Sequence, residues 1–324
     1  MVKLSIVICT FNRASSLKKC LASLTKQTFT NFEVIIIDGG STDATNQVIN
    51  QYSQRLKLKT IVNRRKELAR VRDQGWRVAQ GKLVAWIDDD VIVSQDWAQS
   101  IIKIFRNNPD VGGVTGPTIV PPRLRQKRDV FFFYHKKGVV SWLGWFWDHF
   151  FLEGGKYKVG RIFKSGTWSP GSNFPACLKI KGLKDVDYLE ACNMTLRKDL
   201  IAQVGGFDYA YRGVAEWSEL DLAIRIKKLG YRLVFSPSVK VHHYISQGGV
   251  FSRRTQAQQR MENFLRFYFT HIFKPKPDYL GKFFTYLLFL NLYWGYKAIT
   301  TKNPHWLGGW LGTITGLVNY VLRH

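Results

Sequence analysis

Short apolar runs alternate with amphipathic stretches along the N-terminal part of the chain. Residues 4–11 are almost entirely apolar or β-branched, which is the pattern of a strand covered on both faces of a parallel sheet. In the stretch that follows, apolar residues recur at helical spacing from Leu17 to Leu24, and Ser15 and Ser16 are candidate N-caps. The same alternation predicts further strands over 33–37 and 83–87 and further helices over 44–52 and 67–80. Alternating strands and helices predict an α/β fold with an open, mostly parallel sheet.

Polar residues follow three of the predicted strands. In open parallel sheets, ligands bind beyond the carboxyl ends of the strands, so these residues are candidates for a site. They are Thr10 with Asn12 and Arg13, then Asp38, and then the run Asp88, Asp89 and Asp90. Three adjacent carboxylates raise one another's pKa unless a cation or strong donors neutralise them. A divalent metal, Mg²⁺ or Mn²⁺, beside a phosphate-bearing ligand would do so. The alternative is a solvated acidic turn, but the apolar strand before the run and the matching Asp38 favour the metal.

The overall charge narrows the choice of partners. The 324 residues carry 48 Lys and Arg against 23 Asp and Glu, a formal charge of +25, which indicates an anionic partner: nucleic acid, anionic lipid or a phosphorylated substrate. The sequence has neither the GxxxxGK[ST] of a P-loop ATPase nor a GxGxxG after the first strand, so both of these nucleotide-binding classes are excluded.

The four cysteines are scattered without CxxC spacing, which argues against a zinc cluster or a disulfide framework and indicates a reducing, cytoplasmic environment.

Two later segments depart from the α/β pattern. Within the insertion 121–175, ten aromatic residues lie between 131 and 151 and are flanked by Lys and Arg; this pattern fits single-stranded nucleic acid, a membrane interface or a buried core segment. Near the C-terminus, 283–296 and 303–322 contain no Lys, Arg, Asp or Glu. The first run is short for a bilayer crossing and the second is rich in Gly, so we expect a re-entrant or interfacial helical pair on an anionic membrane surface. A helical appendage packed on the core or on a second subunit is the alternative.

Taken together, the motifs resemble those of a known family. The segments SIVICTFNR, IIIDGGSTDAT, ARVRDQG, WIDDD and VGGFD, and then EWSELDLAIRIKKLGYR and VHH, occur in the family's order over about residues 4–243. The chain resembles the family-2 glycosyltransferases of the GT-A fold, which is Rossmann-like. It departs from the family pattern at Arg72-Asp73, where Arg-Asn is usual, and at Ser218-Glu219, where Glu-Asp is frequent.

The resemblance implies roles for most of the candidate residues. Thr10 and Asp38 would hold the base of a nucleotide, uracil in our expectation, and Arg72 would approach its diphosphate. Asp88 would lie against the ribose or a metal-bound water, and Asp90 would bind the metal, joined by His242 or His243. Asn12, Arg13 and Asp89 complete the expected donor site.

The chemistry of sugar transfer also calls for a base. A carboxylate set apart from the metal cluster must take the proton of the acceptor hydroxyl, and Glu219 is the first candidate, with Glu216 and Asp221 as alternatives. A helix that begins at Asp221 would bury Leu222, Ile226 and Leu229 and place Glu219 at or just before its N-terminus. A capping role for Glu219 or Asp221 is the competing interpretation. By resemblance, one base and no covalent nucleophile imply inversion at the anomeric carbon.

We therefore expect a metal-dependent, inverting glycosyltransferase of the hexosyltransferase type. It would use a nucleotide-sugar donor, a UDP-sugar, and a glycan or lipid-linked acceptor, at the cytoplasmic face of a membrane or in the cytoplasm. The expected parts are a nucleotide-sugar-binding half (1–115), an acceptor-binding half (116–245) and a C-terminal helical, membrane-associating extension (246–324). A homo-oligomer is compatible with this scheme, and nucleic acid is not an expected partner. The alternatives are a polyprenyl-phosphate sugar synthase, a basic nucleic-acid-binding protein and a non-catalytic scaffold.

Overall fold

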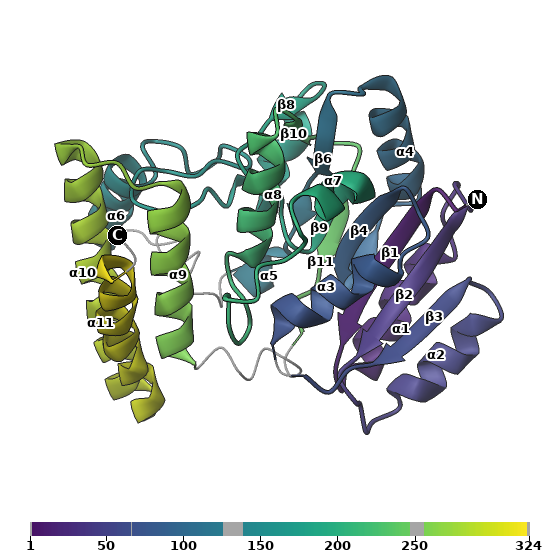
Figure 1. Ribbon diagram of the computed structural model, residues 1–324, viewed down its shortest axis with the longest axis horizontal. Helices are drawn as coiled ribbons and strands as arrows, with labels where there is room; N and C mark the ends of the chain where they lie inside the picture. Colours follow the sequence, from purple (N-terminus) through teal and green to yellow (C-terminus); the bar gives the residue numbers. More distant parts are fainter. Residues whose placement is uncertain (1, 66, 126–138, 247–255, 323–324) are drawn as a thin grey trace.

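An eight-stranded mixed sheet forms the centre of the protein. A computed structural model describes residues 2–65, 67–125, 139–246 and 256–322 (Figure 1). The strand order is β3-β2-β1-β4-β9-β6-β10-β8. The strands are β1 (Leu4–Thr10), β2 (Phe32–Asp38), β3 (Leu58–Val62), β4 (Leu83–Asp88), β6 (Val111–Thr115), β8 (Lys184–Asp185), β9 (Asn193–Arg197) and β10 (Arg232–Phe235). β1 to β4 pair in parallel, as does β10 with β6, so the prediction of a mostly parallel sheet is confirmed.

Helices cover both faces of this sheet because the strands alternate their side chains between two apolar cores. One core packs the sheet against α1 (Ala14–Leu24), α2 (Thr45–Ser53) and α4 (Trp97–Asn107), and the other against α3 (Leu68–Val78), α7 (Lys198–Gln203) and α8 (Ser218–Lys228). In β1, Ile6 and Ile8 belong to the first core and Val7 to the second. The strands and helices predicted for the N-terminal part are all present. The expected N-cap at Ser15 or Ser16 is wrong, since α1 begins at Ala14 and Arg13 occupies its N-cap position.

Two strand arrangements were not predicted, and both shape the site. β9 inserts between β4 and β6 and runs antiparallel to both. A second sheet of three short strands, β5 (Val91–Val93), β11 (Val241–His243) and β7 (Thr118–Ile119), lies in the order β5-β11-β7. In this sheet His243 pairs with Val91, directly after the run of three aspartates.

The C-terminal part is helical and has an apolar core of its own. It consists of α9 (Ala257–His271), α10 (Pro277–Thr300), the 3₁₀ turn η6 (Pro304–Leu307) and α11 (Gly308–Val321), which stand beside the α/β core in Figure 1. α11 lies close against α9 at Gly312, where an added Cβ would come within 2.3 Å of the Gln258 carbonyl oxygen. Among the described helices, none is both long enough and apolar enough to span a bilayer.

The aromatic insertion joins this C-terminal core. Residues 126–138, which include Phe131 to Tyr134, lie outside the described residues. The described part forms α5 (Pro122–Arg125), α6 (Val139–Phe146) and the π-helical turn η2 (Trp147–Phe151), followed by the 3₁₀ turns η3 (Gly171–Asn173) and η4 (Pro175–Lys179). Phe151 is fully buried against α9 and α10, whereas Trp142 and Trp145 are 62% and 54% exposed. Within the described part of the segment, the buried-core interpretation therefore holds for Phe151 and does not hold for Trp142 and Trp145.

Candidate active site

Three parallel strands end side by side and place their terminal residues at one edge of the sheet. β1 pairs Thr10 with Asp38 of β2 and Cys9 with Asp88 of β4. A cavity of about 190 Å³ opens at this edge. Seven of the predicted site residues line it: Thr10, Arg13, Arg72, Asp88, Asp89, Glu216 and Glu219. The expected clustering of these residues at the strand ends is what the structure shows.

The three successive aspartates have different surroundings, and the middle one, Asp89, is held by neighbouring side chains. Asp89 is 2% exposed and accepts hydrogen bonds from Thr10 Oγ1 and Arg13 Nη1, both at 2.7 Å. Burial raises the pKa of Asp89 to about 7, against the lowering effect of Arg13. Asp89 therefore holds Thr10 and Arg13 in the cavity wall.

Asp88 and Asp90 come together with a histidine from the small sheet. Their carboxylates and the imidazole of His243 offer one ligand atom each, and these atoms lie within 4.8 Å of one another. His243 Nε2 lies 3.1 Å from Asp90 Oδ1 and 3.9 Å from Asp88 Oδ2. Two carboxylate oxygens and one imidazole nitrogen form a donor set that suits a divalent ion such as Mn²⁺ and leaves coordination positions for a phosphate. The residues present thus fit the predicted metal.

The two adjacent histidines are distinguished by the strand that carries them. Successive side chains of a strand point to opposite faces, so only one of His242 and His243 can face the aspartates. That residue is His243, which also lies 3.7 Å from Cys192 Sγ through its Nδ1. His242 is not part of the group of potential ligands.

Asp38 and Asn12 shape the turn beside the cavity. Asp38 is 1% exposed and accepts hydrogen bonds from the backbone N–H of Ser41 (3.0 Å) and from its hydroxyl (2.5 Å). Asn12 has a left-handed backbone (φ 52°), and its Oδ1 accepts a hydrogen bond of 2.8 Å from the N–H of Thr42. Both residues lie next to the cavity without lining it; their neighbours Phe11 and Gly39 do so.

Glu219 faces the cavity from the first turn of α8. Its Oε2 lies 3.2 Å from Arg72 Nη1, with side chains 13% and 10% exposed. α8 begins at Ser218, so the expected start at Asp221 is wrong, and Leu229, expected in the buried stripe, is 38% exposed. The helix has no side-chain cap, so the capping role considered for Glu219 is not what the structure shows.

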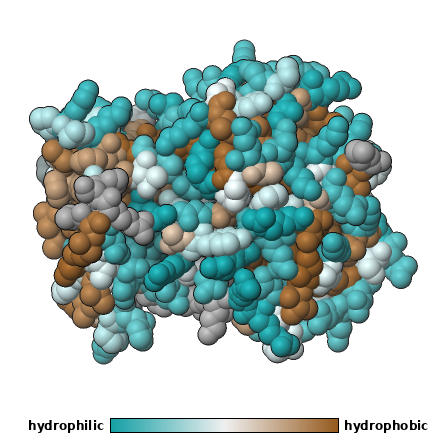
Figure 2. Space-filling view, in the orientation of Figure 1, coloured by the Kyte–Doolittle hydropathy of each residue, from teal (hydrophilic) through white to brown (hydrophobic). Residues whose placement is uncertain are grey.

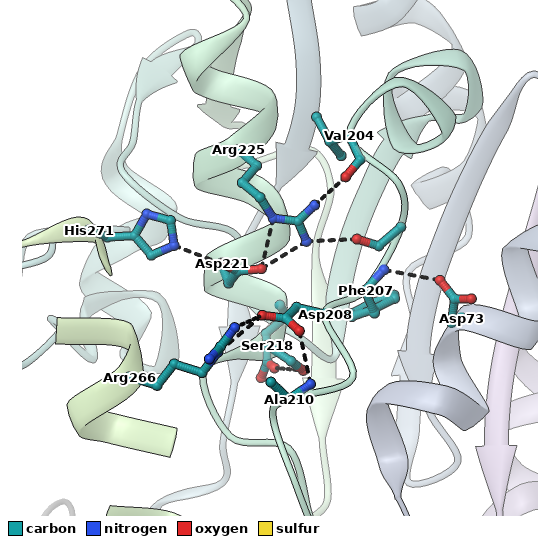
Figure 3. A network of polar contacts seen from close by, with 12 residues as sticks. Asp73, Val204, Phe207, Asp208, Ala210, Ser218, Asp221, Arg225, Arg266 and His271 are labelled. Carbon is teal, nitrogen blue, oxygen red and sulfur yellow. Dashed lines mark hydrogen bonds and ion pairs between the residues drawn. The ribbon is translucent and has the colours of Figure 1, made fainter. Parts of the chain in front are cut away.

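Glu216 and Asp221, the two alternative candidates for the base, have different partners. Glu216 lines the cavity, and its Oε2 accepts a hydrogen bond of 2.7 Å from Arg260 Nε. Asp221 points away from the cavity to the side shown in Figure 3, where it lies 2.7 Å from His271 Nε2 and 2.8 Å from Arg225 Nη2. Glu219 and Glu216 therefore remain as candidate bases.

The contacts of Figure 3 fix the helix that carries Glu219. Arg225 donates to the carbonyl oxygens of Val204 (2.6 Å) and Gly206 (2.7 Å), while Asp221 joins α8 to α9. Asp73, the departure from the family pattern, belongs to the same framework. It is fully buried and accepts hydrogen bonds from the Phe207 N–H (3.0 Å), among others. Asp73 thus supports the loop before α8 and does not line the cavity.

Sequence reasoning missed two residues that contact the candidate metal ligands Asp90 and His243. The N–H of Ser246 donates to Asp90 Oδ2 at 2.8 Å, and Cys192 neighbours His243. Cys192 directly precedes β9, and the N-terminal end of β9 lies at this edge of the sheet. A search for polar residues after the C-terminal ends of strands therefore does not find Cys192. Ser246 lies three residues beyond β11 and carries no motif.

Comparisons with known proteins agree with this geometry. The family model described as Glycosyl transferase family 2 matches residues 5–171, which is more than half of the chain. The chain belongs to glycosyl transferase family 2. Its fold is similar to that of TarS 1–349 from S. aureus in complex with UDP-GlcNAc, with a TM-score of 0.61 at 15% identity, covering 98% of this chain and 80% of that one. A second similar structure is the mannosyltransferase PcManGT from Pyrobaculum calidifontis in complex with GDP-Man and Mn²⁺, with a TM-score of 0.55 at 16% identity, covering 98% and 87%. The predicted GT-A fold is thereby confirmed.

Relatives in sequence match mainly over the N-terminal part. Validoxylamine A glucosyltransferase from Streptomyces hygroscopicus subsp. jinggangensis is 37% identical over 103 residues, which is 31% of this chain and 24% of that protein. The glucosyl-dolichyl phosphate glucuronosyltransferase of Haloferax volcanii is 23% identical over 250 residues, 75% of this chain and 69% of that protein. The match thus spans about a quarter of the Streptomyces protein and a larger share of the Haloferax protein.

Proposed function

We propose that this protein is an inverting glycosyltransferase that transfers a sugar from a UDP-sugar to a hydroxyl group of a glycan or lipid-linked acceptor, with a divalent metal. The observation that carries the proposal is the presence, on one cavity, of a metal-ligand group and a separate carboxylate. Asp88 of the Asp88, Asp90 and His243 group lines the same cavity as Glu219. Sugar transfer from a nucleotide diphosphate needs both functions.

Each side chain has a task that follows from its place. Asp88, Asp90 and His243 would hold the metal, which supplies stabilisation of the departing diphosphate when bound. Arg13 and Arg72 also line this cavity and add positive charge beside the diphosphate. Glu219 takes the proton of the acceptor hydroxyl, while Arg72 compensates the carboxylate charge before the acceptor arrives.

The proposal of a UDP-sugar and a lipid-linked acceptor draws on the similar proteins. TarS binds UDP-GlcNAc and PcManGT binds GDP-Man in their structures, so both nucleotide classes occur on this fold. The Haloferax relative is named for transfer to glucosyl-dolichyl phosphate, a lipid-linked sugar. A lipid-linked acceptor would also bring the protein to the cytoplasmic face of a membrane.

Calorimetric titration tests the donor site. The protein is titrated with UDP, GDP and CDP, with and without Mn²⁺, and Asp90→Ala is compared with Asp96→Ala, which removes an exposed carboxylate outside the cavity. We expect UDP to bind only with Mn²⁺, the Asp90 variant to lose this binding and the Asp96 variant to retain it. Binding of no nucleotide by folded protein would overturn the proposal, and tighter binding of GDP would correct the donor.

A further inference from the structure

A second cavity lies between the α/β core and the C-terminal helices. Its volume is about 290 Å³, close to the lower limit of about 300 Å³ for small-molecule sites. Its walls are aromatic and aliphatic almost throughout, with Trp168, Trp217, Trp294, Phe289 and Leu290 among them. Among the described lining residues, Arg260 is the only charged one. Such walls suit an apolar chain with an anionic group at one end.

This aromatic cavity adjoins the candidate active site through two consecutive residues. Glu216 lines the active-site cavity, and Trp217 lines the aromatic cavity. Trp217 has a left-handed backbone (φ 72°), which a bulky residue rarely adopts, so the loop is held in place by its surroundings. Arg260 lines the aromatic cavity and donates a hydrogen bond of 2.7 Å to Glu216. The end of the aromatic cavity that carries Arg260 therefore lies beside Glu216, one of the two candidate bases.

The outer surface of the same helices is apolar. On α10 the exposed residues Phe284, Leu288, Leu292 and Ile299 share one face, while Phe289 and Leu290 face the cavity. α11 adds Trp310, Ile314 and Val318, which are each at least 46% exposed. Figure 2 shows the hydrophobic side chains gathered over these helices on the left of the view. Exposed apolar residues gathered on neighbouring helices mark an interaction site, and the charge of +25 favours an anionic lipid surface over a second copy.

We propose that the aromatic cavity binds the apolar chain of a lipid-linked acceptor, with Arg260 beside the anionic group that joins the chain to its sugar. The proposal rests on the proposed function and specifies its acceptor. A chain seated against Trp217 directs its polar end past Glu216 into the cavity of Glu219, where transfer occurs. The exposed face of α10 and α11 lies on the membrane that carries the acceptor.

Two substitutions at Leu290 test the cavity, one by filling it and the other by removing part of its wall. Leu290→Trp fills it and Leu290→Ala removes part of its wall, and the matched controls are Leu288→Trp and Leu288→Ala on the exposed face of the same helix. Farnesyl phosphate, below its micelle concentration, is titrated into each variant by calorimetry, and farnesol replaces it in a parallel series. Thermal unfolding of each variant shows whether it is folded.

We expect farnesyl phosphate to bind the wild type and both Leu288 variants equally. The Leu290→Trp variant should bind at least about tenfold more weakly and the Leu290→Ala variant several-fold more weakly. Farnesol should bind the wild type several-fold more weakly than the phosphate. Equal binding by the Leu290 and Leu288 variants, or no saturable binding by the wild type, would overturn the proposal. UDP binding with Mn²⁺, measured on the same samples, separates this failure from failure of the proposed donor site.

Discussion

The pair formed by Arg72 and Glu219 lets the energetics of the candidate site be tested apart from its chemistry. The charged atoms are 3.2 Å apart, and both side chains are almost buried. At an effective dielectric constant of about 20, unit charges at this separation attract by about 5 kcal/mol before the cost of desolvation. The pKa of Arg72 follows the same balance: burial lowers it, but Glu219 and Asp88 outweigh burial and raise it.

Removing one residue of the pair should therefore lower the free energy of unfolding more than removing both. Arg72→Met leaves the Glu219 carboxylate without its partner, and we expect the free energy of unfolding to fall by about 3–5 kcal/mol. The double variant Arg72→Met/Glu219→Gln buries no uncompensated charge, so it should lose only about 1 kcal/mol.

Urea unfolding of the wild type, both single variants and the double variant measures these differences, provided that the slopes of the transitions agree. With a slope of about 3 kcal/mol per M, the midpoint of Arg72→Met should lie about 1 to 1.7 M urea below that of the wild type. If Arg72→Met is as stable as the wild type, or if the double variant is the least stable of the four, Arg72 and Glu219 do not form the buried pair described above.

Three further predictions concern separate parts of the structure. His243→Ala should weaken Mn²⁺-dependent UDP binding at least about tenfold in calorimetry, because it removes a ligand, whereas His242→Ala should leave it nearly unchanged; equal losses would contradict the assignment. The pKa of Asp221 is lowered because its bonds to His271 and Arg225 outweigh burial, so its stabilisation is present above about pH 3.8 and is lost as the pH falls further. As the pH falls below that value, the melting temperature of the Asp221→Asn variant should therefore fall less than that of the wild type. Equal falls in the two proteins would refute this prediction. Gly312→Ala should cost about 1–3 kcal/mol because its Cβ meets the backbone of α9, whereas Gly281→Ala, with open space around it, should be neutral or stabilising in the same melts.

The N-terminal half of the sheet was predictable because its signals are local. β1, β2 and β4 are runs of mainly apolar residues, and their polar residues follow each strand directly. β3 was not predicted, because its short segment is partly exposed and contains Lys59 and Thr60. β9 was not predictable in this way, since its place between β4 and β6 depends on pairing with strands that lie more than 80 residues earlier in the chain, and not on its own sequence. The antiparallel insertion also brings Cys192 to the site.

Within the site, residue types were predictable and their directions were not. The run of aspartates indicated a metal, but only the backbone shows that Asp89 turns inward to Thr10 and Arg13. Similarly, Glu219 and Asp221 are two residues apart on a helix, so they face nearly opposite sides, and the start of α8 decides which one meets the cavity. That start carries no capping signal, because its N-cap position is Trp217 in a left-handed conformation.

Release of the nucleotide from sugar donors is the most direct test of the proposed activity. The wild type and Glu219→Gln are incubated with UDP-, GDP- and CDP-sugars, with Mn²⁺ or with a chelator, and the free nucleoside diphosphate is measured over time with water or an added lipid-linked hydroxyl as acceptor. We expect UDP to be released by the wild type only with Mn²⁺ and about 10² to 10⁴ times more slowly by Glu219→Gln. Release that does not need the metal, or equal rates in both proteins, or no release from any donor by folded protein, would contradict the account.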